Sequence, residues 1–226
     1  IFTVTQSKEK HKELDIPFIT NGVASALELL KDTITKEIKV AEKFPAGLPG
    51  KLHYIKSQPA DSLFKPMMHR SDNFFAEQTL LMVSNQLLGV MNDDKIIDTL
   101  LKTDFKDLPQ KPNWADGSGL SRFNLFTPLD FIWILNKMKN DFDFKRISAI
   151  FSTGNTGTLT NYYTTDSSFI YAKTGSLSGV IALSGYLITK KNKTLIFSVL
   201  VNNHQTTGRN VRRAIEKFIT SVRNKY

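Results

Sequence analysis

Three apolar segments in the C-terminal third of the chain place the strongest constraint on its fold. Residues 168–174, 180–188 and 194–201 are each short and rich in β-branched and aromatic residues, which favours strands. Ser178-Gly179 separates the first pair, and residues 190–193, all lysine or asparagine, separate the second. Both gaps suit hairpin turns. The sequence therefore predicts a three-stranded antiparallel meander.

The tripeptide Lys173-Thr174-Gly175 lies near the end of the first predicted strand. A lysine there can contact a substrate carboxylate, and a threonine hydroxyl can form a hydrogen bond with it. The glycine lets another backbone approach closely, and a strand edge can pair with an extended peptide. Taken alone, however, the tripeptide fits an ordinary strand with a solvated lysine better than it fits a site.

Two further motifs change this interpretation. Ser71-Asp72-Asn73 lies upstream, at the start of a helical pattern, and residues 116–124 read Asp-Gly-Ser-Gly-Leu-Ser-Arg-Phe-Asn. Ser-Asp-Asn and Lys-Thr-Gly occur together with Ser-x-x-Lys in penicillin-binding proteins and class A β-lactamases. With all three motifs in this order, the chain resembles the D-alanyl-D-alanine carboxypeptidase/endopeptidase family, the low-molecular-mass class C penicillin-binding proteins. The resemblance runs from about residue 57 to residue 201, and β-lactamases do not share the Asp-Gly-Ser-Gly-Leu-Ser stretch.

Most of the chain before the meander has a helical pattern, and one more helix follows it. Helices are expected from residue 21 or 22, over 62–68, after residue 73, near 96–101, from Thr127-Pro128 and over 208–223. Two apolar stripes are expected to face the core: Leu80, Val83, Leu87, Leu88 and Met91, and then Val211, Ile215, Phe218, Ile219 and Val222. Helices first and a meander later indicate an α+β fold.

The resemblance implies a penicillin-binding/β-lactamase-like transpeptidase fold, with a helical region and an antiparallel sheet that is incomplete on its N-terminal side. Residues 1–20 are then expected to be an N-terminal connecting segment. Residues 21–226 would be the C-terminal part of the D-Ala-D-Ala peptidase domain.

Composition excludes several classes of function. The 226 residues include no cysteine, so disulfides, thiolate metal sites and cysteine nucleophiles are absent. The formal charge is +9, but the basic residues are dispersed without interleaved aromatics, which indicates a solvated surface and no nucleic-acid partner. The chain contains no run of about 18 apolar residues, so no integral membrane segment is predicted. No metal or other cofactor is expected, because the four histidines show no paired ligand spacing: His11, His53, His69 and His204.

The resemblance implies a serine nucleophile and a lysine base one helical turn apart in Ser-x-x-Lys, and the chain offers two poor matches. Ser7 to Lys10 lies in a run of charges where nothing would exclude water from the lysine. Ser62 to Lys65 has better surroundings, but on a continuous helix Ser62 would lie roughly 13 Å from Ser71 unless Pro66 bends the helix. We therefore expect the chain to be the C-terminal part of a longer enzyme, lacking the upstream segment that carries the nucleophile.

The same resemblance implies catalytic roles for three residues. Ser71 would relay a proton between the base and the leaving amine, Asn73 would hydrogen-bond the acylated amide of the substrate, and Lys173 would supply positive potential. Asp72 is expected to cap the following helix rather than to contact substrate.

The substrate-binding segment implied by the resemblance is Thr174, Gly175 and Ser176. Thr174 would bind the terminal carboxylate of D-alanine, and the Ser176 backbone N–H would be one oxyanion donor. Two roles remain open for Asp116 and Ser121, contact with substrate or stabilisation of their own glycine-rich loop.

The activity implied is that of a serine-type D-Ala-D-Ala carboxypeptidase/endopeptidase, which acts on peptidoglycan stem peptides through an acyl-enzyme. The implied partners are a stem peptide ending in D-Ala-D-Ala, β-lactam antibiotics and the missing N-terminal segment of the parent chain. The implied compartment is periplasmic or otherwise extracytoplasmic. Two alternatives remain, a non-catalytic cell-wall-peptide-binding protein of the same fold and a serine β-lactamase. The second is disfavoured by residues 116–121 and by the lack of a recognisable deacylating glutamate motif.

Overall fold

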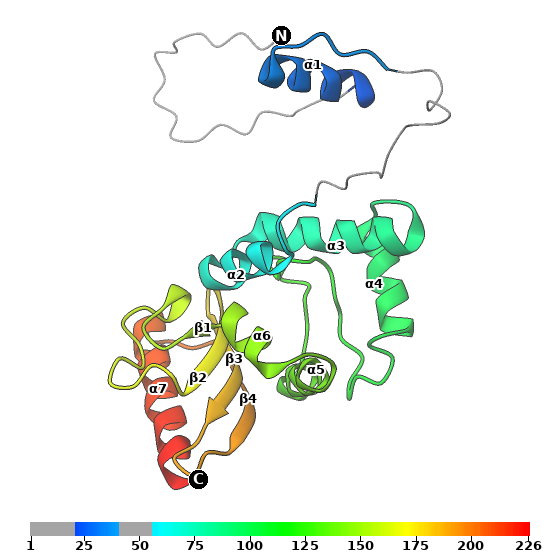
Figure 1. The fold of residues 1–226 in the computed structure, drawn as a ribbon. Helices are drawn as coiled ribbons and strands as arrows, with labels where there is room; N and C mark the ends of the chain where they lie inside the picture. The colour runs from blue at the N-terminus through cyan, green and yellow to red at the C-terminus, as the bar shows by residue number, and fades with distance from the viewer. Residues whose placement is uncertain (1–20, 41–55) are drawn as a thin grey trace, which may run out of the picture. The chain divides into compact units, whose positions relative to one another are not determined.

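The computed structural model describes residues 21–40 and 56–226, and the chain divides into two compact units after Ile55. The described part of the first unit contains one helix, α1 (Val23–Ile34), which follows Gly22 as the sequence predicts (Figure 1). The expected connecting segment 1–20 and the Ser7 to Lys10 match lie outside the described residues, as do His11 and His53. Every other described element belongs to the unit formed by residues 56–226.

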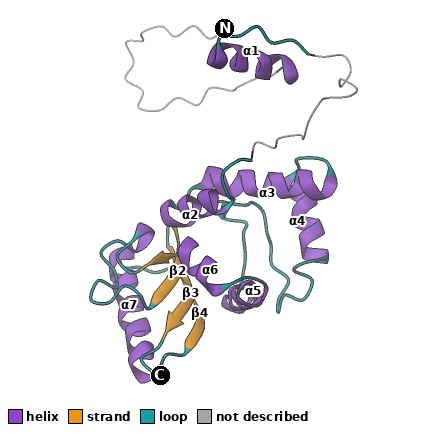
Figure 2. Cartoon of the chain, in the orientation of Figure 1, coloured by secondary structure: helices purple, strands orange, loops and turns teal. Residues whose placement is uncertain are grey.

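An antiparallel sheet forms the centre of the second unit, and its strands are orange in Figure 2. The strand order is β1-β2-β3-β4. Its strands are β1 (Ser152–Thr153), β2 (Ile170–Leu177), β3 (Val180–Ile188) and β4 (Thr194–Asn202). The predicted meander is confirmed as β2, β3 and β4. The position of Lys173 within its strand differs from the prediction, because Gly175 pairs with Ala182 and the ladder continues to Leu177. Lys173 therefore lies in the middle of β2.

Helices cover both faces of the sheet, which gives the α+β architecture that the sequence predicts (Figure 1). The helices of this unit are α2 (Asp61–Arg70), α3 (Asn73–Leu88), α4 (Asp93–Lys102), α5 (Pro128–Asp141), α6 (Phe144–Ile150), α7 (Gly208–Lys225) and the 3₁₀ turn η1 (Gly157–Leu159). On one face, Ile215 and Ile219 of α7 pack against alternate residues of β2 and β3. On the other face, Leu135 of α5 and Ile147 of α6 pack around Tyr186.

A smaller apolar cluster lies between α3 and α4, where Leu80 packs with Ile96 and Ile97. The stripe predicted along α3 is only partly correct, because Leu87 and Met91 are each 57% exposed and Leu88 is 37% exposed. The reason is that this cluster surrounds only the part of α3 near Leu80.

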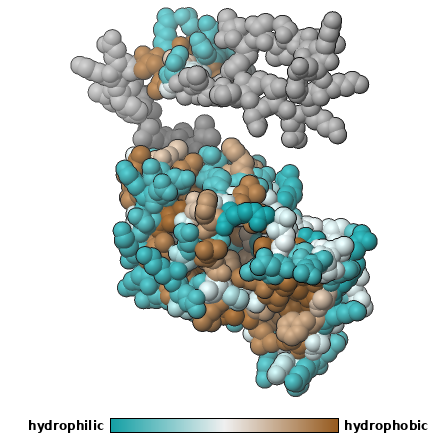
Figure 3. All heavy atoms as spheres, turned by 180° about the vertical axis from the view of Figure 1, so that it is seen from behind, coloured by the Kyte–Doolittle hydropathy of each residue, from teal (hydrophilic) through white to brown (hydrophobic). Residues whose placement is uncertain are grey.

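The apolar stripe predicted on α7 is confirmed with one exception. Val211, Ile215 and Ile219 are buried, whereas Phe218 is 58% exposed. Phe218 stands one position before Ile219, about 100° around the helix from it. Phe218 is one of several large apolar side chains exposed on the surface of this unit. Figure 3 shows that apolar and polar side chains are mixed on one face.

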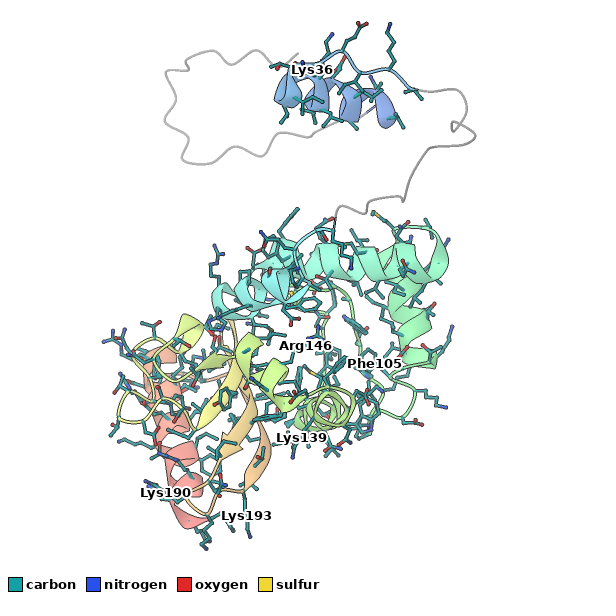
Figure 4. The ribbon with its side chains drawn as sticks, viewed as in Figure 1. Lys36, Phe105, Lys139, Arg146, Lys190 and Lys193 are labelled. Atoms are coloured by element: carbon teal, nitrogen blue, oxygen red, sulfur yellow. The ribbon has the colours of Figure 1, made fainter. Side chains whose placement is uncertain are left out.

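Local sequence signals explain the start of α5 and the turn between β3 and β4. Thr127 and Asp130 form the reciprocal hydrogen bonds of a capping box at the start of α5, with Pro128 in the first turn. Lys190 and Lys193 belong to the predicted turn between β3 and β4, and Figure 4 shows them at the end of that hairpin.

Candidate active site

Ser71 occupies a tight turn between two helices. It ends α2 with φ 55° and ψ 51°, the left-handed conformation that residues with a Cβ seldom adopt. Asp72 then begins α3 as its N-cap, and its Oδ1 accepts a hydrogen bond from the Phe75 N–H over 3.0 Å. The capping role expected for Asp72 agrees with this contact.

Contacts at both ends of α2 fix the helix that carries Ser71. Near its start, Asp61 pairs with Arg146 of α6, with 2.7 Å between Oδ1 and Nη2. Near its end, Nε2 of His69 lies 3.1 Å from the carbonyl oxygen of Phe151. Burial lowers the pKa of His69, and the charge of Lys65 lowers it further. His69 therefore packs at the end of α2 against the segment that carries Phe151.

Lys173 reaches Ser71 from the sheet. Its Nζ donates one hydrogen bond to Oγ of Ser71 over 2.7 Å and another to the carbonyl oxygen of Thr174 over 2.6 Å. Burial lowers the pKa of Lys173 from its ordinary value of 10.5 to about 8. The structure thus brings together the two residues on which the sequence interpretation depends most.

A cavity of about 360 Å³ opens beside this contact, within the range of small-molecule sites. Of the predicted site residues, Ser71, Thr174 and Ser176 line it, and Lys173 contacts two of them. Asn73 is exposed at the first position of α3 and does not line the cavity.

Three lining residues were not predicted from the sequence. Thr158 and Tyr162 belong to the segment at and after η1, and Arg212 comes from the first turns of α7. Nη2 of Arg212 donates to Oγ of Ser176 over 2.7 Å. No motif marks these positions, because each becomes part of the site only when distant elements pack together.

The glycine-rich loop of residues 116–124 is stabilised by its own side chains. The Asp116 carboxylate accepts hydrogen bonds from the N–H groups of Gly119 and Ser121, both over 2.6 Å. It also accepts one from Nδ2 of Asn124 over 2.9 Å. These contacts favour the structural role over the substrate-contacting role for Asp116.

Glu77, which the sequence interpretation missed, attaches this loop to α3. Its carboxylate accepts hydrogen bonds from the N–H groups of Gly117 and Ser118, each over 2.9 Å. A Cβ at Gly117 would lie 2.9 Å from the carbonyl oxygen of Ala76, so glycine permits this close approach. On its other side the loop reaches the β2–β3 turn, where Arg122 donates to the carbonyl oxygen of Ser178 over 3.3 Å.

One edge of β2 is available for pairing beside the cavity. β1 pairs only with Tyr171 and Ala172, and in the described part of the chain no strand pairs with residues 173–177 on that side. Such an edge can take an extended peptide as an added strand.

Within residues 21–40 and 56–226, no group of three or more histidine, aspartate or glutamate side chains is placed to hold a metal ion. None of the helices described there has the length and apolar character needed to cross a membrane.

Comparison with known proteins supports the same family. The model of the D-Ala-D-Ala carboxypeptidase 3 (S13) family matches residues 18–222. Carboxypeptidase DacB of Mycolicibacterium smegmatis is 27% identical over 97% of this chain and 48% of its own length. D-alanyl-D-alanine carboxypeptidase DacB of Haemophilus influenzae is 26% identical over 75% of this chain and 37% of its own length. The chain thus spans less than half the length of these two relatives.

Solved structures share the fold. Penicillin-binding protein 4 (dacB) of Haemophilus influenzae, complexed with a β-lactam, aligns with a TM-score of 0.64 and 23% identity. That alignment covers 92% of this chain and 52% of the other. A predatory endopeptidase of Bdellovibrio bacteriovorus, in complex with an immunity protein, aligns with a TM-score of 0.62 and 20% identity over 76% of this chain and 47% of its own. The fold is therefore that of the penicillin-binding proteins, and the chain belongs to the D-Ala-D-Ala carboxypeptidase 3 (S13) family.

Proposed function

We propose that this chain forms the substrate-binding half of a serine-type D-Ala-D-Ala carboxypeptidase or endopeptidase that cleaves peptidoglycan stem peptides through an acyl-enzyme. The observation that carries the proposal is the 2.7 Å contact between Nζ of Lys173 and Oγ of Ser71 at the edge of the cavity. The family match over residues 18–222 supports the same reaction class.

Acyl transfer requires that the leaving amine receive a proton as its bond to the acyl carbon breaks. The Ser71 hydroxyl accepts a hydrogen bond from Lys173, so its own proton is free to be donated toward the cavity. With a pKa of about 8, Lys173 is still mostly protonated at neutral pH but releases its proton more readily than an ordinary lysine. In this proposal Ser71 relays the proton and Lys173 supplies the positive potential.

The groups around the cavity are suited to a peptide that lies along β2. The hydroxyl of Thr174 would bind the terminal carboxylate, and the N–H of Ser176 would be one oxyanion donor. The unpaired edge of residues 173–177 would hydrogen-bond the peptide backbone. Asn73, close to Ser71 in the chain, would contact the acylated amide.

We propose that the nucleophilic serine and its lysine belong to a part of the parent protein outside residues 56–226. Ser62 and Lys65 are both exposed. α2 continues through Pro66 to Arg70, so along its axis Ser62 stays more than about 10 Å from Ser71. Since the chain spans about half the length of its relatives, a longer parent has room for the Ser-x-x-Lys segment. Peptidoglycan as substrate would place that parent in the periplasm or another extracytoplasmic compartment.

The test is D-alanine release from diacetyl-Lys-D-Ala-D-Ala by a longer product of the same gene that contains Ser-x-x-Lys. Ser71→Ala and Lys173→Ala should each lower kcat by at least about 100-fold, the usual contribution of a positioned proton-transfer group. Lys190→Ala, which removes a lysine from the β3–β4 turn, serves as the matched control and should leave kcat unchanged.

Three results would contradict the proposal. Ser71→Ala and Lys173→Ala with unchanged kcat would exclude the relay. A wild-type protein that binds the peptide without releasing D-alanine would identify a non-catalytic binding protein. Hydrolysis of penicillin faster than of the peptide would identify a β-lactamase.

A further inference from the structure

Arg212 lies where its positive charge can interact with a charged group of a peptide in the cavity. It is half-buried in α7 and lines the cavity together with Ser71, Thr174 and Ser176. Its Nη2 donates to Oγ of Ser176 over 2.7 Å. Ser176, at the end of the Lys-Thr-Gly-Ser segment, thus contacts a guanidinium that belongs to no sequence motif.

The position of the guanidinium is fixed by packing at the start of α7. Ser176 of β2 stands opposite Ile181 of β3. A Cβ at Gly208, in the first turn of α7, would lie 3.4 Å from both Cδ1 of Ile181 and Nη1 of Arg212. The Arg212 side chain therefore passes across Gly208 to reach the edge of the cavity.

No acidic side chain neutralises Arg212 within the described part of the chain. The cavity lining contains no aspartate or glutamate, and none of the ion pairs recorded for residues 21–40 and 56–226 includes Arg212. The nearby Glu216 accepts instead from Nη1 of Arg213 and from the Tyr163 N–H, both over 2.6 Å. The positive charge therefore remains directed at the cavity.

We propose that Arg212 binds the free C-terminal carboxylate of the peptide and makes the site selective for it. A guanidinium has five N–H donors, so the bond to Ser176 leaves others for a carboxylate, which it can hold in a bidentate manner. Thr174 and Ser176 would then supply hydroxyl contacts while Arg212 supplies the charge. This inference rests on the proposed function and identifies the group that distinguishes a free acid from an amide.

The experiment measures binding of diacetyl-Lys-D-Ala-D-Ala and of its C-terminal amide to the 226-residue chain by NMR titration. Wild type should bind the acid about tenfold more tightly than the amide, the effect of one hydrogen bond to a charged group. Arg212→Gln should weaken acid binding about tenfold, leave amide binding unchanged and so remove the preference. Arg212→Lys should keep part of it. Arg209→Gln removes an exposed positive charge from the same helix outside the cavity lining, and this matched control should behave as wild type.

The outcomes separate this inference from the proposed function. If Arg212→Gln keeps the full acid preference while Thr174→Val loses it, the carboxylate site exists and Arg212 is not part of it. If Arg212→Gln weakens acid and amide equally, the residue only supports the structure, and the inference is wrong. If the wild-type chain binds neither peptide, the proposed function fails and the inference fails with it.

Discussion

Nζ of Lys173 donates a hydrogen bond to Oγ of Ser71 over 2.7 Å, across 102 positions of sequence. Different elements hold the two residues, a left-handed turn between α2 and α3 for Ser71 and the middle of β2 for Lys173. The contact therefore depends on how the helical part of this unit packs on the sheet, and a change at either residue should be measurable at the other.

We expect Lys173 to titrate near pH 8, because burial lowers its pKa to about 8 from 10.5. NMR of isotopically labelled lysine side chains should show one signal with a midpoint near pH 8 that is missing from Lys173→Met. Ser71→Ala should shift that signal, whereas Lys190→Ala should not. Lysine signals that all titrate above about pH 10 would show that Lys173 is not desolvated.

The lowered pKa also predicts how stability depends on pH. Between pH 8 and 10.5 the unfolded chain binds a proton at Lys173 that the folded chain does not, so the free energy of unfolding should rise with pH. Below pH 8 Lys173 is charged in both the folded and the unfolded chain, so the full cost of burying that charge lowers the free energy of unfolding. Lys173→Met should therefore be more stable than wild type at pH 7, and chemical denaturation should show this advantage shrinking toward pH 10.5. An advantage that stays constant over this range would contradict the linkage.

Ser71 should show a conflict between stability and activity. A residue with a Cβ at φ 55° is strained, and glycine removes that strain. Ser71→Gly should raise the free energy of unfolding by about 1 kcal/mol, whereas Ser71→Ala, which keeps the Cβ, should change it by less than about 0.5 kcal/mol. Both should lose the relay function. Equal stability of the two variants in urea denaturation would exclude backbone strain at this position.

Glu77 should be needed to hold the loop of residues 116–124 against α3. Glu77→Ala removes the acceptor of two N–H groups and should lower the free energy of unfolding by about 1–3 kcal/mol. Amide exchange at Gly117 and Ser118 should accelerate. Asp98→Asn, at an exposed acid of α4, is the control and should have almost no effect. Unchanged amide exchange in Glu77→Ala would remove its positioning role.

Gly185 should tolerate no side chain. It pairs with Ala172, and a Cβ there would lie 2.6 Å from Cα of Ala172 in the adjacent strand β2. Gly185→Ala should force β2 and β3 apart, lower the free energy of unfolding by about 3 kcal/mol or more, and displace Lys173 from Ser71. Thermal melting measures the first effect. A variant that melts like wild type would mean that the sheet can adjust.

Local patterns were sufficient to predict much of the fold. The meander, the N-cap Asp72 and the helix start at Thr127-Pro128 depend on residues close in sequence, and all are confirmed. The stripe on α3 was predicted too long, because periodicity shows which face is apolar but not how far a neighbour covers it. The short elements β1, α6 and η1 were not predicted, since few residues give no clear period.

The site was predictable only where motifs mark it. Ser71, Thr174 and Ser176 belong to motifs and line the cavity, whereas Thr158, Tyr162 and Arg212 line it without any motif. Glu77 follows Asn73 on α3, yet its role depends on a loop 40 positions away. Such contacts arise from tertiary packing and leave no trace in a single sequence.

The most direct test is intact-mass measurement after incubation with penicillin, made in parallel on the 226-residue chain and on a longer gene product with Ser-x-x-Lys. A covalent adduct requires an activated serine oxygen, whereas Lys173 and Thr174 alone would hold the drug only reversibly. We predict one penicilloyl group on the longer protein, at a serine outside residues 56–226, and none on the 226-residue chain. A penicilloyl adduct on the shorter chain would contradict this account. At Ser62 it would overturn the proposal that the nucleophile lies outside residues 56–226, and at Ser7 it would overturn the prediction that the 226-residue chain lacks the nucleophile.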